Sequence, residues 1–148
     1  MKKLNLQLLA IFSFLFLFTI NASAHCEIPC GIYDDEMRIN MINEHIATIE
    51  KSMNQIVKKE KEGHHNSNQL IRWVMNKEHH ADELQEIVTQ YFMTQRIKLD
   101  TKDYEKKLGA LHQMLIYSMK CKQTTDLSYA IKLKGLVKDF QALYFGKK

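Results

Sequence analysis

The chain has a single proline, Pro29, and the sequence after it is free of this helix breaker. A proline inside a helix removes a backbone hydrogen bond and clashes with the preceding turn, so its absence permits long helices. Apolar residues in this part recur at three- and four-residue steps, which is the pattern of amphipathic helices. The pattern predicts helices over about residues 36–61 and 68–95, a third from 100 or 101 to about 120, and a fourth from the segment 124–126 to about 144.

Short polar segments separate these expected helices, and several contain residues that end or begin a helix. Gly63 closes the first helix, and Thr124, Thr125 and Asp126 open the fourth, because Thr and Asp side chains accept hydrogen bonds from the free N–H groups of a helix start. Helices of similar length joined by short loops pack as antiparallel neighbours. We therefore expect an all-α fold, an antiparallel up-down four-helix bundle over residues 36–148.

Lys77 interrupts the apolar stripe of the second expected helix. A lysine can lay its methylene stem along apolar neighbours while its ammonium group reaches water. We expect Lys77 to reach solvent in this way.

The first 24 residues have the features of a secretory signal peptide. Two lysines precede an apolar run over residues 8–20, and Ala22 and Ala24 form the small-x-small pattern that signal peptidase reads. The apolar run is shorter than the ~20 residues that a membrane-spanning helix needs. We predict that residues 1–24 are removed, and that the mature protein is periplasmic or secreted, without stable membrane association.

The composition limits the possible partners. The chain has 21 Lys and Arg residues against 17 Asp and Glu, and two of the lysines belong to the expected signal peptide. The weakly basic remainder, with its scattered charges, gives no reason to expect a nucleic-acid partner.

The odd number of cysteines, Cys26, Cys30 and Cys121, leaves at least one thiol without a disulfide partner in the chain. Cys121 is expected to be a free, partly buried thiol in the third helix.

Cleavage after Ala24 would make His25 the first residue of the mature chain. A metal would then find five donors close together: the α-amine and imidazole of His25, the backbone nitrogen and thiolate of Cys26, and the thiolate of Cys30. Two nitrogens and two sulfurs in a plane, with an axial imidazole, favour Cu(II) or Ni(II) over zinc, which prefers a tetrahedron. We therefore predict a metal-binding hook over residues 25–35.

The hook sequence His-Cys-Glu-Ile-Pro-Cys-Gly-Ile-Tyr resembles the nickel hook of nickel-dependent superoxide dismutases, which reads H-C-x-x-P-C-G-x-Y at the processed N-terminus. The matching residues are His25, Cys26, Pro29, Cys30, Gly31 and Tyr33. The resemblance implies an enzyme that disproportionates superoxide to oxygen and hydrogen peroxide by cycling nickel between Ni(II) and Ni(III). It also implies a four-helix subunit and a homohexamer.

Carried over by position, the resemblance assigns the metal ligands to His25, Cys26 and Cys30. His25 would supply its amine and an axial imidazole, Cys26 an amide nitrogen and a thiolate, and Cys30 the second thiolate. Tyr33 would be the aromatic residue that guards access to the metal, which completes the catalytic set.

Four positions depart from the usual family pattern. Glu27 stands where an aspartate is usual, and Asp35 replaces a proline that often follows the Tyr-Asp pair. Asn40 and His80 align with a glutamate and an arginine that orient the axial imidazole in better-known members. Because such partners set ring orientation and ligand basicity, the resemblance implies a different environment for the imidazole of His25.

The residues alone leave two alternatives open. Oxidising compartments favour disulfides, and a Cys26–Cys30 bridge would make the protein a non-catalytic helical bundle with a stapled tail. An N-terminal histidine also chelates copper through its amine and imidazole, which would make the protein a periplasmic copper-binding or redox protein.

Overall fold

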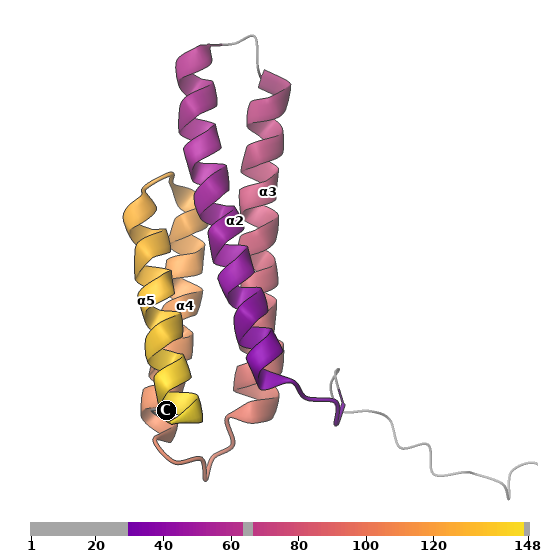
Figure 1. The fold of residues 1–148 in the computed structure, drawn as a ribbon, viewed down its shortest axis with the longest axis vertical. Helices are drawn as coiled ribbons and strands as arrows, with labels where there is room; N and C mark the ends of the chain where they lie inside the picture. The colour runs from indigo at the N-terminus through magenta and orange to yellow at the C-terminus, as the bar shows by residue number, and fades with distance from the viewer. Residues whose placement is uncertain (1–29, 64–66, 147–148) are drawn as a thin grey trace, which may run out of the picture.

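The computed structural model describes residues 30–63 and 67–146, and this part of the chain is helical throughout, without strands. The helices are α2 (Asp35–Glu62), α3 (Ser67–Glu86), the π-helix η2 (Ile87–Arg96), α4 (Tyr104–Gln123) and α5 (Leu127–Phe145). Because η2 continues α3, the helices form four rods that run alternately up and down (Figure 1). The predicted all-α four-helix fold is confirmed.

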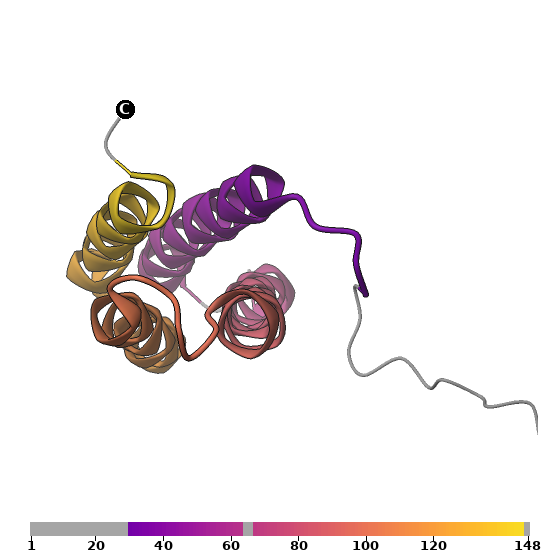
Figure 2. The same ribbon diagram turned by 90° about the horizontal axis from the view of Figure 1, so that it is seen from below.

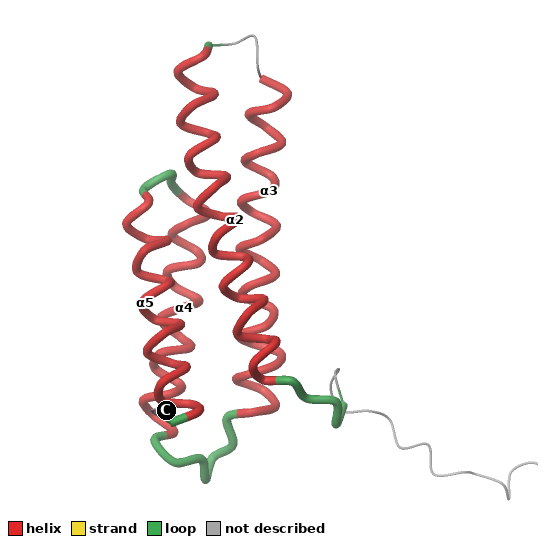
Figure 3. The backbone as a smooth tube through the Cα atoms, in the orientation of Figure 1, coloured by secondary structure: helices red, strands yellow, loops and turns green. Residues whose placement is uncertain are grey.

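The rods stand at the corners of a bundle, and each packs against two neighbours. α2 contacts α3 and α5, while α4 contacts α5 and α3, as the end-on view shows (Figure 2). The described loops between η2 and α4 and between α4 and α5 lie at the ends of the rods (Figure 3). α2 and α3 extend beyond the loop that joins α4 to α5, so their far ends form a protruding pair (Figure 1).

α2 buries a stripe of residues spaced three and four apart, as the sequence pattern predicts. Its start is capped by Asp34, whose Oδ1 accepts a hydrogen bond from the backbone N–H of Met37 at 2.9 Å. This bond satisfies one of the donors that a helix start leaves free. The stripe is fully buried against the other rods and consists of Ile39, Ile42, Ile46, Ile49 and Met53.

α4 begins later than predicted. The sequence placed its start at Asp100 or Thr101, but the N–H of Thr101 donates to the carbonyl of Lys98 at 2.9 Å and the N–H of Tyr104 to that of Thr101 at 3.0 Å. The chain therefore makes two turns before the helix starts. Asp103, with a φ of 56°, is left-handed, a conformation that Asp tolerates better than most residues and that an α-helix does not contain. The helix consequently starts at Tyr104.

The second rod changes its winding at Ile87, which the sequence did not predict. In η2 hydrogen bonds span five residues, and the rod closes with the N–H of Ile97 donating to the carbonyl of Phe92 at 2.9 Å. Ile87, Phe92 and Ile97 are five residues apart and all buried. A spacing of five matches the hydrogen-bond step of a π-helix, so the apolar residues of this part are consistent with the wider winding.

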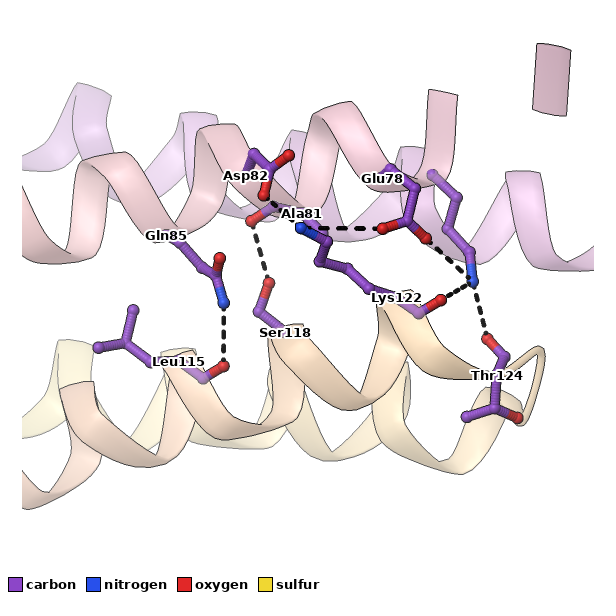
Figure 4. Close-up of polar contacts among 9 residues, drawn as sticks. Glu78, Ala81, Asp82, Gln85, Leu115, Ser118, Lys122 and Thr124 are labelled. Atoms are coloured by element: carbon purple, nitrogen blue, oxygen red, sulfur yellow. Dashed lines mark hydrogen bonds and ion pairs between the residues drawn. The ribbon is translucent and has the colours of Figure 1, made fainter. Parts of the chain in front are cut away.

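Side chains and backbone carbonyls join α3 to α4. The Ser118 hydroxyl donates to the carbonyl of Ala81 at 3.0 Å, and the Gln85 amide donates to the carbonyl of Leu115 at 3.2 Å (Figure 4). Ser118 is fully buried, and a buried hydroxyl without a partner would cost stability. These bonds therefore help to fix how the two rods lie along each other.

Lys77 is buried, and the expectation that it reaches solvent is wrong. Its Nζ donates to the carbonyl of Lys122 at 2.5 Å and to that of Thr124 at 3.1 Å. These carbonyls lie at the C-terminal end of α4, where the last turn lacks helical partners and the helix dipole favours a positive charge. Lys77 thus caps the end of a neighbouring helix.

The expected signal peptide, residues 1–24, lies outside the described residues. In the part of the chain that the structure describes, no helix combines the length and the apolar character needed to cross a membrane.

Candidate functional site

Of the three expected metal ligands, one lies within the described residues. His25 and Cys26 lie outside the described residues, as does Glu27, whereas Cys30 is the first described residue and is exposed. The segment 30–34 runs from Cys30 into the start of α2 and leads away from the bundle (Figures 1 and 2). Gly31 has a φ of 74°, a left-handed conformation that glycine adopts without strain, so the chain turns directly after Cys30.

Tyr33 connects this segment to the second rod. The guanidinium carbon of Arg96 lies 4.4 Å from the centroid of the Tyr33 ring, well within the range of a cation–π contact. The ring of Tyr91 meets the Tyr33 ring edge-on, at 5.9 Å between centroids and 67° between planes. Tyr33 still exposes 42% of its surface, so its ring is held by η2 while part of it faces solvent.

Asp35, the first residue of α2, accepts hydrogen bonds from three side chains of two other rods. The Arg96 Nε and Nη2 donate to Oδ1 and Oδ2, each at 2.8 Å. The Tyr91 hydroxyl donates to Oδ1 at 2.5 Å, and the Tyr144 hydroxyl, from α5, donates to Oδ2 at 2.8 Å. Both carboxylate oxygens are therefore shared between an arginine and a tyrosine.

These bonds shift the proton affinities of the whole cluster. Burial opposes ionisation of Asp35, but the hydrogen bonds from Arg96, Tyr91 and Tyr144 outweigh burial and lower the pKa of Asp35. Burial and the bond to Asp35 raise the pKa of Tyr144 to about 12, and the same two causes raise the pKa of Tyr91. The bond to Asp35 also raises the pKa of Arg96. At neutral pH the cluster thus consists of one carboxylate, one guanidinium and two neutral phenols.

The two positions expected to orient the axial imidazole lie in different surroundings. Asn40 is exposed on α2. The Nδ1 of His80 lies 2.8 Å from the Nδ1 of His45, with 5.1 Å between ring centroids. Among the described residues, neither Asn40 nor His80 has a hydrogen bond to residues 30–34.

The histidine pair is shifted toward its neutral form. Burial and the charge of His80 lower the pKa of His45. Burial and the charge of His79 lower the pKa of His80. The Nε2 of His45 is buried and has no hydrogen-bond partner in the described part of the chain. The pair therefore joins α2 to α3 best when both rings carry no charge.

The described residues contain no group of three or more His, Cys, Asp or Glu side chains that could hold a metal ion. Of the expected ligands they include only Cys30, whose exposure leaves its thiol open to a ligand. A thiolate with the terminal amine, the imidazole of His25 and the thiolate of Cys26 would make a nitrogen and sulfur donor set that suits nickel. The donor chemistry of the hook therefore fits that metal.

Sequence reasoning missed the side chains that hold the base of the hook, namely Tyr91, Arg96 and Tyr144. Asp35 was noted only as a departure from the family pattern. The sequence signal available was that departure itself, because an acid at the base of the hook calls for a partner. It did not reveal which partners would lie beside it.

A comparison with models of protein families matches residues 20–148 to the family described as nickel-containing superoxide dismutase. The matched range includes the hook and every described helix. Comparisons with curated proteins and with solved structures gave no match.

Proposed function

Because the chain belongs to the family of nickel-containing superoxide dismutases, we propose that its nickel ion is held by His25, Cys26 and Cys30 at an N-terminus that signal cleavage exposes. The chain is an enzyme that disproportionates superoxide, and nickel is its cofactor. The assignment of ligands is carried by one observation: the family match spans the hook motif together with the whole bundle. The copper-binding and disulfide-stapled alternatives are not favoured by this match.

The described end of the hook supports this assignment. Cys30 is exposed, so its thiol is not occupied by packing. The left-handed Gly31 turns the chain next to it. Tyr33 then holds the segment against η2 through Arg96. Anchoring Tyr33 reduces the conformational freedom that Cys30 has to lose when a ligand binds.

Each group of the hook has a definite task in the reaction. Nickel held by His25, Cys26 and Cys30 would supply the one-electron redox chemistry that the disproportionation of superoxide needs. The thiolates and the amide nitrogen are strong donors that stabilise the higher oxidation state. The second superoxide needs two protons to leave as hydrogen peroxide. The phenol of Tyr33 and the backbone N–H groups of residues 31–34 are the groups that would position the anion and pass protons to it.

We also propose export and assembly into a homohexamer. Export is supported by the signal-peptide features of residues 1–24. Assembly is supported by the protruding end of the α2–α3 pair, which α4 and α5 do not cover (Figure 1). Ile71, Val74 and Met75 lie on one face of α3 near this end and expose 58%, 38% and 65% of their surface. An exposed apolar stripe of this kind marks a surface that contacts another protein.

Native mass spectrometry of the protein exported through its own signal, purified without chelators, tests the proposal. We expect a hexamer of chains that begin at His25, each with one nickel ion. Cys30→Ala should lose the nickel and the activity, because one of the two thiolates is removed. Cys121→Ala is the matched control, since this cysteine is buried in α4 and should leave the nickel in place.

Two outcomes would contradict the assignment. Chains without metal that are lighter by two hydrogens would show a disulfide and a stapled tail. Copper in place of nickel, in a protein without dismutase activity, would indicate the copper-binding alternative.

A further inference from the structure

The described hook makes few contacts with the bundle, and they converge on one residue. Cys30 and Gly31 are exposed, and Ile32 exposes 81% of its surface. Tyr33 is the residue of the segment whose side chain packs against another rod, with its ring beneath the guanidinium of Arg96. The position of Cys30 therefore depends on how firmly Tyr33 is held.

Arg96 is fixed on its other side by Asp35. Two parallel hydrogen bonds of 2.8 Å join the guanidinium to the two carboxylate oxygens, and such a fork restricts the plane of the guanidinium as well as its position. The hydroxyls of Tyr91 and Tyr144 hold the same carboxylate. The guanidinium thus lies between a carboxylate with three side-chain partners and the Tyr33 ring.

The π-winding of η2 makes this arrangement possible. Tyr91 and Arg96 are five residues apart and both bond to Asp35. In an α-helix of 3.6 residues per turn, residues five apart point in directions that differ by about 140°. Only the wider winding brings both side chains to one carboxylate, and π-helical turns are frequent at functional sites.

We propose that Arg96 is a positioning residue for the metal site: clamped by Asp35, it stacks on Tyr33 and thereby fixes the hook, with Cys30, at the base of the bundle. This inference rests on the proposed ligand assignment for its effect on catalysis. Its effect on the hook itself does not depend on nickel. We call the pair of Asp35 on α2 and Arg96 on η2 the clamp. Asp35 is one of the positions that depart from the family pattern.

Three variants of the mature, full-length protein test the clamp. Arg96→Gln removes the charge and the fork. Arg96→Lys keeps the charge but offers neither a planar group to stack nor a bidentate fork. Arg72→Gln is the matched control, because Arg72 lies exposed on α3. For each protein, backbone ¹⁵N NMR relaxation is measured without metal, and it gives an order parameter for each amide of residues 31–34. Nickel content and dismutase rate per bound nickel are measured in the loaded enzyme.

We expect the order parameters of residues 31–34 to fall below about 0.6, the range of a flexible backbone, in both Arg96 variants, while those of α5 stay as in wild type. The rate per bound nickel should fall roughly 10- to 100-fold in Arg96→Gln, which is the loss expected when reacting groups are displaced by about 1 Å. Arg96→Lys should not restore it. Arg72→Gln should match wild type in every measurement.

Unchanged order parameters of residues 31–34 in Arg96→Gln would overturn the clamp. So would a loss of activity in proportion to the nickel lost, because that result indicates weaker metal retention without displacement. Full recovery by Arg96→Lys would show that charge alone matters and would overturn the stacking role. If wild type itself bound no nickel, the ligand assignment would fail, and the order parameters measured without metal would still decide whether Arg96 holds the hook.

Discussion

Replacing Lys77 with Met should destabilise the bundle, although it removes a buried charge. The Lys77 ammonium makes two bonds to carbonyls at the end of α4, and hydrogen bonds to charged groups contribute about 1.5–3 kcal/mol each. A cation at a partly buried helix C-terminus adds up to about 2 kcal/mol. Against these gains stands the cost of burying the ammonium, which is several kcal/mol for an ion.

The balance depends on what the variant leaves behind. Met keeps most of the apolar stem of Lys77, so little packing is lost, and it relieves the cost of burying a charge. The carbonyls of Lys122 and Thr124 lose their donor, but both residues are partly exposed, so water can replace part of the bonds. We therefore expect a net loss of about 2 kcal/mol, which is below the roughly 3–8 kcal/mol that the two bonds and the charge at the helix end contribute together.

Thermal unfolding followed by circular dichroism measures this loss. For a domain of this size, about 2 kcal/mol corresponds to a decrease in Tm of roughly 8 °C. Lys132→Met is the control, because Lys132 is exposed on α5, and surface substitutions stay within about 0.5 kcal/mol. The deficit of Lys77→Met should persist at about 1 M salt, because the ammonium is buried and its bonds to carbonyls are screened far less than an exposed ion pair. A Lys77→Met protein as stable as wild type would refute the reasoning, because relief of the buried charge would then match the lost bonds.

Two further predictions concern protons and the N-terminus. The lowered pKa values of His45 and His80 mean that the folded state binds fewer protons than the unfolded state, whose histidines titrate near pH ~6.5. The contribution of the pair to stability is therefore complete above that pH and falls as the pH drops through it. The Tm of wild type should decrease between pH 7.5 and pH 5, and the Tm of His80→Gln should decrease less, while the control His112→Gln, changed at an exposed position, should show the same decrease as wild type. An equal decrease in wild type and both variants would contradict the role of the pair. One extra residue before His25 should abolish nickel binding and dismutase activity, because it moves the α-amine out of its chelate ring. Mass spectrometry and a superoxide assay measure the two losses, and full activity in the extended protein would exclude the amine as a ligand.

The sequence predicts most of the fold because helix formation depends on local spacing. Ile39, Ile42 and Ile46 define one face of α2 from neighbouring residues alone, and the structure buries all three. The change of winding at Ile87 was not predictable in this way, because a five-residue apolar spacing overlaps with the three- and four-residue spacings around it. Lys77 was misjudged for a different reason. Its partners are carbonyls 45 and 47 residues further along the chain, and no local pattern indicates them.

The difference between local patterns and contacts of distant residues also applies to the site: it explains why the metal ligands were predicted and the side chains that hold the base of the hook were not. The hook motif is contiguous, so its residues could be named from the sequence. The side chains that hold its base come from Arg96 and Tyr144, which lie 61 and 109 residues from Asp35. Only the assembled bundle brings them together, and so the sequence showed Asp35 merely as a departure from a pattern.

Asp35 links the first helix, the last helix and the hook through one carboxylate. As the first residue of α2, it places a negative charge where the helix dipole favours one, which a proline at that position would not do. The same carboxylate orients Arg96 toward Tyr33 and accepts a bond from Tyr144 near the end of α5. Because Arg96 and Tyr91 come from η2 and Tyr144 comes from α5, the carboxylate of Asp35 has all its side-chain partners only in the assembled bundle, and the support of Cys30 is complete only then. An isolated peptide with the hook sequence has the same donors but lacks this support.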